Sequence, residues 1–452
     1  MSITLIFGLL LQLAALAIVL RQVRSRLLMF NGAILIVMLC IFHGLPEIAN
    51  LLYPGINHNL VLVDQEAVDR WVLIVGFAIL LFSVFYSRTL KRNRKSRFES
   101  RAQTPPKVSL PALFSMAIPA FIIVVISGLG NYSTYGYWIT GLSQELFPLL
   151  MVMFFNISIM HLPRRWTLFL VVAEVLLFTI VGSRIYVLAV FVMTAGALTR
   201  YGRPLKFRSL CIGFMLFATL SVLISSSRFY YGRETYRAPI GVRISNIARS
   251  ASTAMGDSEF DIKGDFIYRF DGNIFPTIVN EKFREGYSGV GLSSFANNFF
   301  LYIPSYFYRS KLDTALEYRD ERAYTQTHFG MWFNNDLATT LFTVLFGYYG
   351  VAGLMLCAAG LGVVFAYLDR WMNSTNTILS YVTGLGLTYC CIITDQGVSV
   401  YFSTFRTVFV LFIVLSVVSR FRLRAGKFQK FHSSRVLANA YSRRSIGDGI
   451  TG

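Results

Sequence analysis

Long apolar runs, separated by short polar segments, dominate the pattern of residues along the chain. A membrane helix needs about 20 apolar residues to cross roughly 30 Å of hydrocarbon. Eleven runs approach this length, and we interpret them as transmembrane helices. They cover residues 3–20, 28–45, 71–87, 111–129, 146–161, 166–182, 185–199, 209–225, 338–368, 377–394 and 400–419. The expected fold is therefore an all-α polytopic membrane protein.

The basic residues lie mainly in the segments that fall on one predicted side of the membrane. These segments and the tail from residue 420 hold 26 of the 42 Lys and Arg residues, but only three acidic residues, Glu99, Asp369 and Asp448. By the positive-inside rule this side is cytoplasmic, which places the N-terminus outside and the C-terminus inside.

Composition supports the membrane assignment and excludes several classes of protein. Hydrophobic residues make up 55% of the chain, charged residues 14%, and the mean hydropathy is +0.55, values that exclude a soluble enzyme. The basic tract at 91–97 is typical of juxtamembrane charge rather than of a nucleic-acid site. All five cysteines lie in apolar runs without ligand spacing, so we expect no disulfide framework, no metal site and no cofactor.

One predicted external segment is much longer than the others. The chain divides into helices 1–8 (1–225), a large external loop (226–337), helices 9–11 (338–419) and a basic cytoplasmic tail (420–452). The stretch 226–335 contains 23 Phe, Tyr and Trp residues, which argues against disorder. We expect this loop to form a mostly helical cap over the outer face, with one helix near 240–255.

Arginines at the predicted outer face are the first candidates for chemistry. Arg184 follows a tight turn between two predicted helices, and Arg228, Arg233 and Arg237 open the large loop. The guanidinium group is a planar fork of donors that suits phosphate oxygens. For the loop arginines, contact with solvent or with lipid headgroups is the alternative.

Further along the loop, charged residues stand beside aromatic ones. Such pairs occur at Arg269 and Asp271 and again at Tyr306, Arg309 and Lys311. Aromatic faces beside hydrogen-bonding groups suit sugar rings, although the same aromatics could anchor the loop in the membrane interface. An imidazole near the membrane surface, at His328, is a candidate base for a sugar hydroxyl, with a structural role as the alternative.

Three short stretches, taken in order, resemble the Wzy-type oligosaccharide repeat-unit polymerases of bacterial O-antigen and capsule pathways. Gly182-Ser183-Arg184 is similar to the family's Gly-x-Arg turn, and residues 303–311 are similar to its Ile-Pro, aromatic and Lys segment. Residues 346–350 resemble the Phe-Gly-x-x-Gly start of the following helix. The family's Arg-x10-Gly loop pattern has only one counterpart, Arg319 to Gly330. The many helices, the abundant Phe and Tyr and the large loop also match this family.

The resemblance implies a membrane glycosyltransferase of the bacterial inner (cytoplasmic) membrane. Its substrate would be an oligosaccharide on undecaprenyl pyrophosphate, polymerised at the periplasmic face into O-antigen for lipopolysaccharide or into capsule. Membrane lipids and a chain-length regulator protein would be the other partners, without nucleic acid. The O-antigen ligase, which has a His before a similar Gly-x-x-Gly helix, and a flippase or exporter of the same lipid-linked sugars remain alternatives.

The resemblance also gives roles to the candidate residues. Arginines would stabilise the charge that develops on the leaving pyrophosphate, and a carboxylate or His328 would take the hydroxyl proton. The residues expected to act in catalysis are Arg184, Arg228, Arg233 and His328. The residues expected to bind substrate are Arg237, Arg269, Asp271, Tyr306, Arg309 and Lys311.

Overall fold

Every regular element in the described part of this computed structural model is an α-helix. The structure describes residues 2–23, 30–54, 63–92, 184–200, 207–232, 240–254, 270–291, 339–375 and 377–394, with isolated positions in 172–179, 267, 328–329 and parts of 401–416. The helices are α1 (Ile3–Val23), α2 (Asn31–Leu52), α3 (Gln65–Arg92), α7 (Arg184–Arg200), α8 (Phe207–Tyr231), α9 (Ile240–Ala254), α11 (Ile274–Arg284), α15 (Leu341–Ser374) and α16 (Ile378–Ile392).

Five of these helices are long and apolar enough to cross a membrane, namely α1, α2, α3, α8 and α15. Two shorter apolar helices, α7 and α16, coincide with the predicted spans 185–199 and 377–394. The helix predicted near 240–255 is confirmed as α9. The predicted spans between 111 and 161 lie outside the described residues, so the count of eleven stays a prediction.

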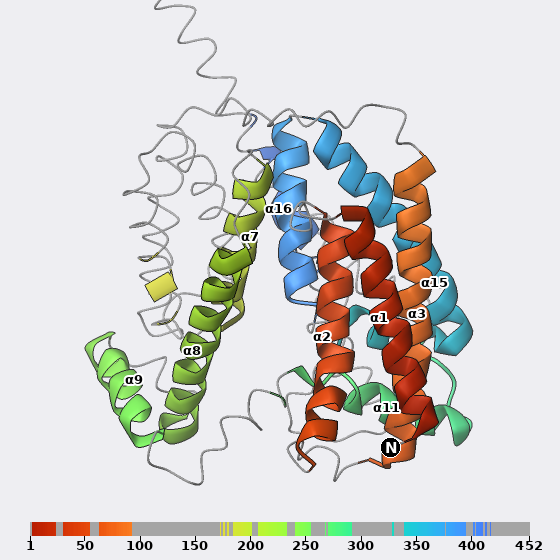
Figure 1. The fold of residues 1–452 in the computed structure, drawn as a ribbon, viewed down its shortest axis with the longest axis horizontal. Helices are drawn as coiled ribbons and strands as arrows, with labels where there is room; N and C mark the ends of the chain where they lie inside the picture. The colour runs from red at the N-terminus through yellow and green to blue at the C-terminus, as the bar shows by residue number, and fades with distance from the viewer. Residues whose placement is uncertain are drawn as a thin grey trace, which may run out of the picture.

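Helix α3 is the central element of the best-packed group of helices. It packs against α1 on one side and α15 on the other (Figure 1). Glycines at the contacts let the helix backbones approach closely. A Cβ at Gly76 would lie only 2.7 Å from Gly8 O, and a Cβ at Gly362 would lie only 2.5 Å from Phe82 O. The fully buried rings of Trp71 and Phe82 fill the space along α3. Small residues therefore set the spacing of these helices, as is common in membrane bundles.

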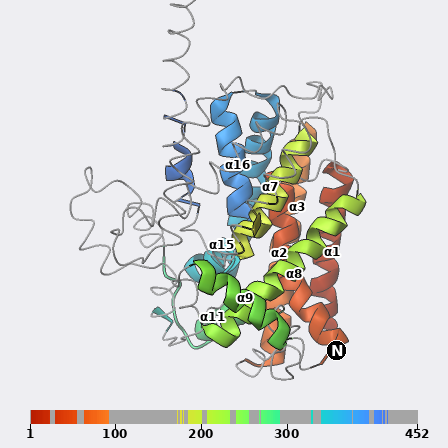
Figure 2. The same ribbon diagram turned by 90° about the vertical axis from the view of Figure 1, so that its left-hand side faces the viewer.

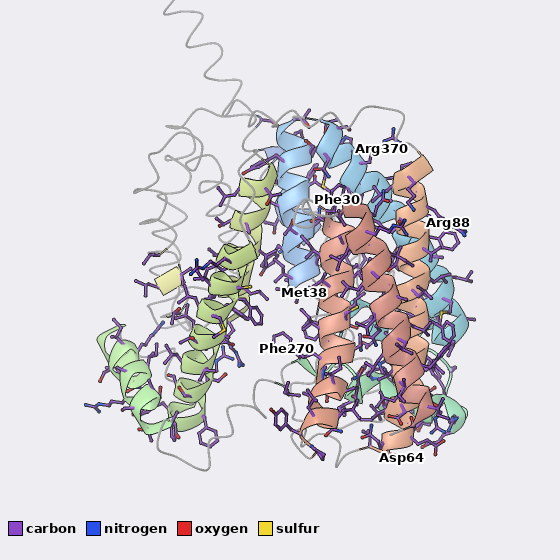
Figure 3. The ribbon with its side chains drawn as sticks, in the orientation of Figure 1. Phe30, Met38, Asp64, Arg88, Phe270 and Arg370 are labelled. Carbon is purple, nitrogen blue, oxygen red and sulfur yellow. The ribbon has the colours of Figure 1, made fainter. Side chains whose placement is uncertain are left out.

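The helices run in directions that agree with the predicted topology. Phe30, Arg88 and Arg370 lie towards the upper end of the bundle, whereas Asp64 lies at the opposite end (Figure 3). The chain begins at this lower end, and both α9 and α11 lie there (Figures 1 and 2). We call it the outer end, because the charge pattern predicts that the N-terminus lies outside.

Asp369, which the sequence analysis assigned to a cytoplasmic loop, is instead fully buried near the end of α15. Its carboxylate accepts hydrogen bonds from the backbone N–H groups of Asn31 (2.8 Å) and Gly32 (2.9 Å) and from the Tyr86 hydroxyl (2.7 Å). These N–H groups begin α2 and have no partner within that helix. A carboxylate from a distant helix thus caps α2, and its negative charge favours the helix N-terminus.

The loop predicted at 46–70 is shorter in the structure, because α2 continues through Pro46 to Leu52 and α3 begins at Gln65. Proline inside a helix has no N–H, so the carbonyl four residues earlier loses its usual donor. That carbonyl belongs to Phe42, and the backbone N–H of Gly272 donates to it at 2.9 Å. A backbone N–H group from a distant part of the sequence therefore replaces the missing donor. This hydrogen bond lies where the sequence predicted the end of the helix.

A second interruption lies in α15 at Gly350, whose φ of 66° and ψ of −165° break the helix. In a continuous helix the carbonyls of Gly347 and Tyr348 would accept from residues 351 and 352. Here they accept instead from Val290 N (3.1 Å) and Gly291 N (3.3 Å). Both ends of the segment 270–291 thus donate hydrogen bonds to carbonyls that lose their usual donors at the two interruptions.

Replacing Gly350 by alanine is expected to destabilise the protein by about 1–3 kcal/mol, because the observed backbone conformation is nearly restricted to glycine. Gly360→Ala is the matched control in the same helix, because a Cβ meets nothing within 4 Å at either position. The control should be neutral or stabilising, since alanine favours a helix. Thermal unfolding in detergent measures both variants. Equal melting temperatures for the two variants would contradict the strained conformation at Gly350.

Candidate functional site

Arg184 and Arg228, two of the predicted catalytic residues, lie at the same interface between helices. Arg184 is the first residue of α7, and its Nη1 donates to the Ser225 hydroxyl oxygen on α8. Ser221, Ser225 and Arg228 are spaced i, i+4 and i+7, so they share one face of α8. Arg228 therefore lies on the α8 face that Arg184 contacts at Ser225, and both arginines are only partly buried.

Arg243, a further arginine of the predicted loop, does not lie with Arg184 and Arg228. Arg243 lies on α9, only 1% exposed, and α9 packs against α8 near the contact between the Ser226 and Ser250 hydroxyls (3.3 Å). Ser226 follows Ser225 and points about 100° away around the helix. Arg243 thus belongs to the α8–α9 contact, whereas Arg184 and Arg228 belong to the α7–α8 contact.

Six predicted site residues lie outside the part of the chain that the structure describes. They are Arg233, Arg237, Arg269, Tyr306, Arg309 and Lys311. Their assignment to the site stays a prediction.

His328, the predicted base, is held against the segment that docks on α15. Its Nε2 lies 2.9 Å from the backbone carbonyl of Ser288, and its ring stands edge-on to Phe329. A carbonyl only accepts, so Nε2 carries the proton in this contact. The contact also gives His328 a structural role beside Val290 and Gly291.

Asp271, predicted to bind substrate, is 2% exposed and accepts from the Asn273 backbone N–H (2.9 Å). It lies at the start of a buried polar network that the sequence analysis did not identify. Asn273, just before α11, contacts His43 and Glu47 on α2, and His43 also contacts Thr340 just before α15. None of these four side chains is more than 1% exposed.

The hydrogen bonds of this network have one consistent direction. The Asn273 amide nitrogen donates to Glu47 Oε1 (2.9 Å) and to His43 O (3.2 Å), so its oxygen accepts from His43 Nδ1 (2.9 Å). His43 Nε2 then accepts from the Thr340 hydroxyl (3.0 Å). Each donor thus meets an acceptor, which is what a buried polar network requires.

Three carboxyl groups gather at this end of the bundle. Asp69 and Asp271 lie close enough to Glu47 to interact with it electrostatically, and Asp69 accepts from the Gln65 amide at 3.0 Å. Among the described residues, no group of His, Cys, Asp and Glu has an arrangement that could hold a metal ion. Hydrogen bonding between helices is therefore the role that the geometry supports.

The sequence contained one indication of this network. His43 and Glu47 are spaced i, i+4, which places both on one helix face. The apolar run stops at residue 45, before Pro46, so the predicted helix contained His43 but not Glu47. Nothing in the sequence links these residues to Asn273, which lies 230 positions after His43.

Comparison with known proteins adds no family. No protein-family model, no curated protein and no solved structure matches the chain.

Removing the Asn273 side chain should destabilise the protein by several kcal/mol, about 2–5, because His43 and Glu47 would lose buried hydrogen bonds. Denaturant unfolding of Asn273→Ala in detergent measures this. Lys282→Ala on α11 is the control, because Lys282 contacts the exposed residues Glu285 (2.6 Å) and Tyr287 (5.4 Å to the ring centroid) rather than the buried network. The control should stay within about 0.5 kcal/mol of the wild type. An Asn273→Ala variant as stable as this control would contradict the network.

Proposed function

We propose that the protein is a membrane glycosyltransferase that polymerises oligosaccharide repeat units, carried on undecaprenyl pyrophosphate, into O-antigen or capsular polysaccharide. The observation that carries the proposal is that Arg184 binds the Ser225 hydroxyl and that Arg228 lies on the same face of α8. Two guanidinium groups beside a hydroxyl match the oxygens of a diphosphate. Arg228 lies near the end of α8 that is followed by α9, and this end would face outside in the predicted topology, where the headgroup of a flipped lipid would be presented.

The proposed setting is the bacterial inner membrane, with the N-terminus in the periplasm and the C-terminus in the cytoplasm. Five apolar helices and the 26-to-3 excess of basic over acidic residues on one side support it. The loop 226–337 would cover the outer face, and its 23 aromatic residues up to position 335 would supply stacking surfaces for sugars.

The proposed reaction needs neither metal nor nucleotide. The bond between the sugar's anomeric carbon and the lipid diphosphate breaks, and the diphosphate leaves with the electron pair. The hydroxyl oxygen of a second lipid-linked unit forms the new glycosidic bond, and its proton passes to a base. Arg184 and Arg228 would stabilise the negative charge that develops on the leaving diphosphate. Among the predicted residues, His328 or a carboxylate would accept the proton.

The buried network on α2 favours a second candidate function, which is proton-coupled export of the same lipid-linked oligosaccharide. Buried His and carboxylate groups between membrane helices are typical of proton pathways. His43, Glu47 and Asp69 form such a group at the outer end. The two functions differ in the product that accumulates when the protein is impaired.

Arg184→Lys and Arg184→Ala are expected to lower the polymerisation rate by about two to three powers of ten, because one bidentate contact contributes about 2–4 kcal/mol in the transition state. Lysine keeps the charge but loses the planar fork. The measurement is the polysaccharide ladder of a deletion strain that carries each variant at verified protein level. Arg249→Ala is the control, because Arg249 is an exposed arginine on α9.

Each outcome of the ladder experiment identifies a different function. A polymerase defect leaves single repeat units attached to lipid core, a ligase defect leaves none attached, and an export defect traps the unit inside the cell. Normal ladders from both Arg184 variants would show that Arg184 does not act on the diphosphate.

A further inference from the structure

The hydroxyl of Ser225 differs from that of its neighbour Ser226 in the hydrogen bond that it makes. A buried serine in a helix commonly donates to a backbone carbonyl three or four residues earlier. Ser226 does so, because its hydroxyl lies 3.0 Å from Leu223 O. For Ser225, whose side chain is only 7% exposed, the single hydrogen bond within the described residues is the one that it accepts from Arg184.

A hydroxyl that accepts a hydrogen bond still has a proton to donate. The Arg184 guanidinium only donates, so it cannot receive this proton. The Ser225 hydroxyl is therefore a buried donor without an acceptor in the part of the chain that the structure describes. Leaving such a donor unpaired costs free energy, which a ligand oxygen would recover.

The surroundings of Ser225 indicate the charge of that ligand. Arg184 holds the hydroxyl from α7, and Arg228 follows it by three residues on the same α8 face. Arg184 also begins α7, and a helix N-terminus carries partial positive charge. The negative charge of an anion would therefore complement the positive charge of this interface. The donors come from three side chains on two helices, which suits an anion larger than a single phosphate.

We propose that Ser225 is a specificity residue of the lipid-phosphate site, and that its hydroxyl lets the site select a polyprenyl diphosphate over the corresponding monophosphate. In this arrangement each arginine holds one phosphate group and Ser225 donates to an oxygen between them. A monophosphate engages one arginine and gains nothing from Ser225. The inference rests on the proposed function, because it assumes that Arg184 and Arg228 bind the lipid headgroup.

The test compares the binding of two lipids to the purified full-length protein in detergent micelles. The probes are a fluorescent polyprenyl diphosphate and a monophosphate with the same chain. Ser225→Ala should weaken diphosphate binding by about tenfold to one hundredfold, which is the effect of losing one hydrogen bond to a charged group. Its affinity for the monophosphate should be unchanged. Ser225→Thr keeps the hydroxyl and should bind like the wild type.

Ser226→Ala is the matched control, because Ser226 is the next residue on α8, is fully buried and faces Ser250 on α9. It should leave both affinities unchanged. Thermal unfolding of each variant shows whether it is folded. A purely structural role for Ser225 would lower the melting temperature, and it would leave the ratio of the two affinities as in the wild type.

Two further results would overturn one proposal without the other. If Ser225→Ala binds both lipids like the wild type while Arg184→Ala binds neither, the role of Ser225 is wrong and the lipid-phosphate site stands. If the wild type binds neither lipid, or if Arg184→Ala binds the diphosphate normally, the proposed function loses its basis and the inference falls with it.

Discussion

The segment 270–291 is held to α2 and α15 by hydrogen bonds to backbone carbonyls. These carbonyls lose their usual donors at two interruptions of the helices. Pro46 releases Phe42 O in α2, and Gly350 releases two carbonyls in α15. In an apolar surrounding such groups must be paired within the protein, because no water is present to pair them. Backbone N–H groups of the segment fill this need at both of its ends. The same bonds therefore complete the helices and fix the position of the segment.

The contact at Pro46 is close because small and polar groups meet there. A Cβ at Gly272 would lie 3.0 Å from His43 Cε1 and 3.2 Å from Phe42 O, so a side chain at this position would push the segment away. The network of His43, Asn273 and Thr340 begins beside this contact and ties the segment to α15 as well. Side-chain and backbone hydrogen bonds thus act on one junction between α2, α11 and α15.

The arginine site is built differently from this junction. Arg184 and Arg228 are partly buried, and they lie on α7 and α8, whereas the junction joins α2, α11 and α15. At the junction most polar groups are paired, although Glu47 Oε2 has no hydrogen-bond partner among the described residues, whereas the arginine site retains the Ser225 donor. The positive charge of the arginine site supports the proposed function, in which it would bind the diphosphate of a lipid-linked substrate.

Hydrophobic runs were sufficient to predict the helices that are apolar around most of their surface, such as α1 and α8. They could not predict where α2 ends, because the donor that lets the helix pass Pro46 comes from residue 272. The same limit applies to Asp369, whose partner Asn31 lies 338 positions away. Arg184 was predictable, since a charge between two apolar runs is conspicuous. Ser225 was not, because a serine in an apolar helix is common and only the contact with Arg184 distinguishes it.

Hydrogen–deuterium exchange of the backbone amides of Gly272, Val290 and Gly291 in a membrane mimetic tests the central claim most directly. If these amides complete the interrupted helices, they should exchange as slowly as amides inside α2 and α15. Ser288 is an internal reference, because it is exposed and its amide donates to no backbone carbonyl among the described residues. Its amide should exchange rapidly. If Gly272 and Val290 exchange as rapidly as Ser288, the segment is not held by the released carbonyls and the account is wrong.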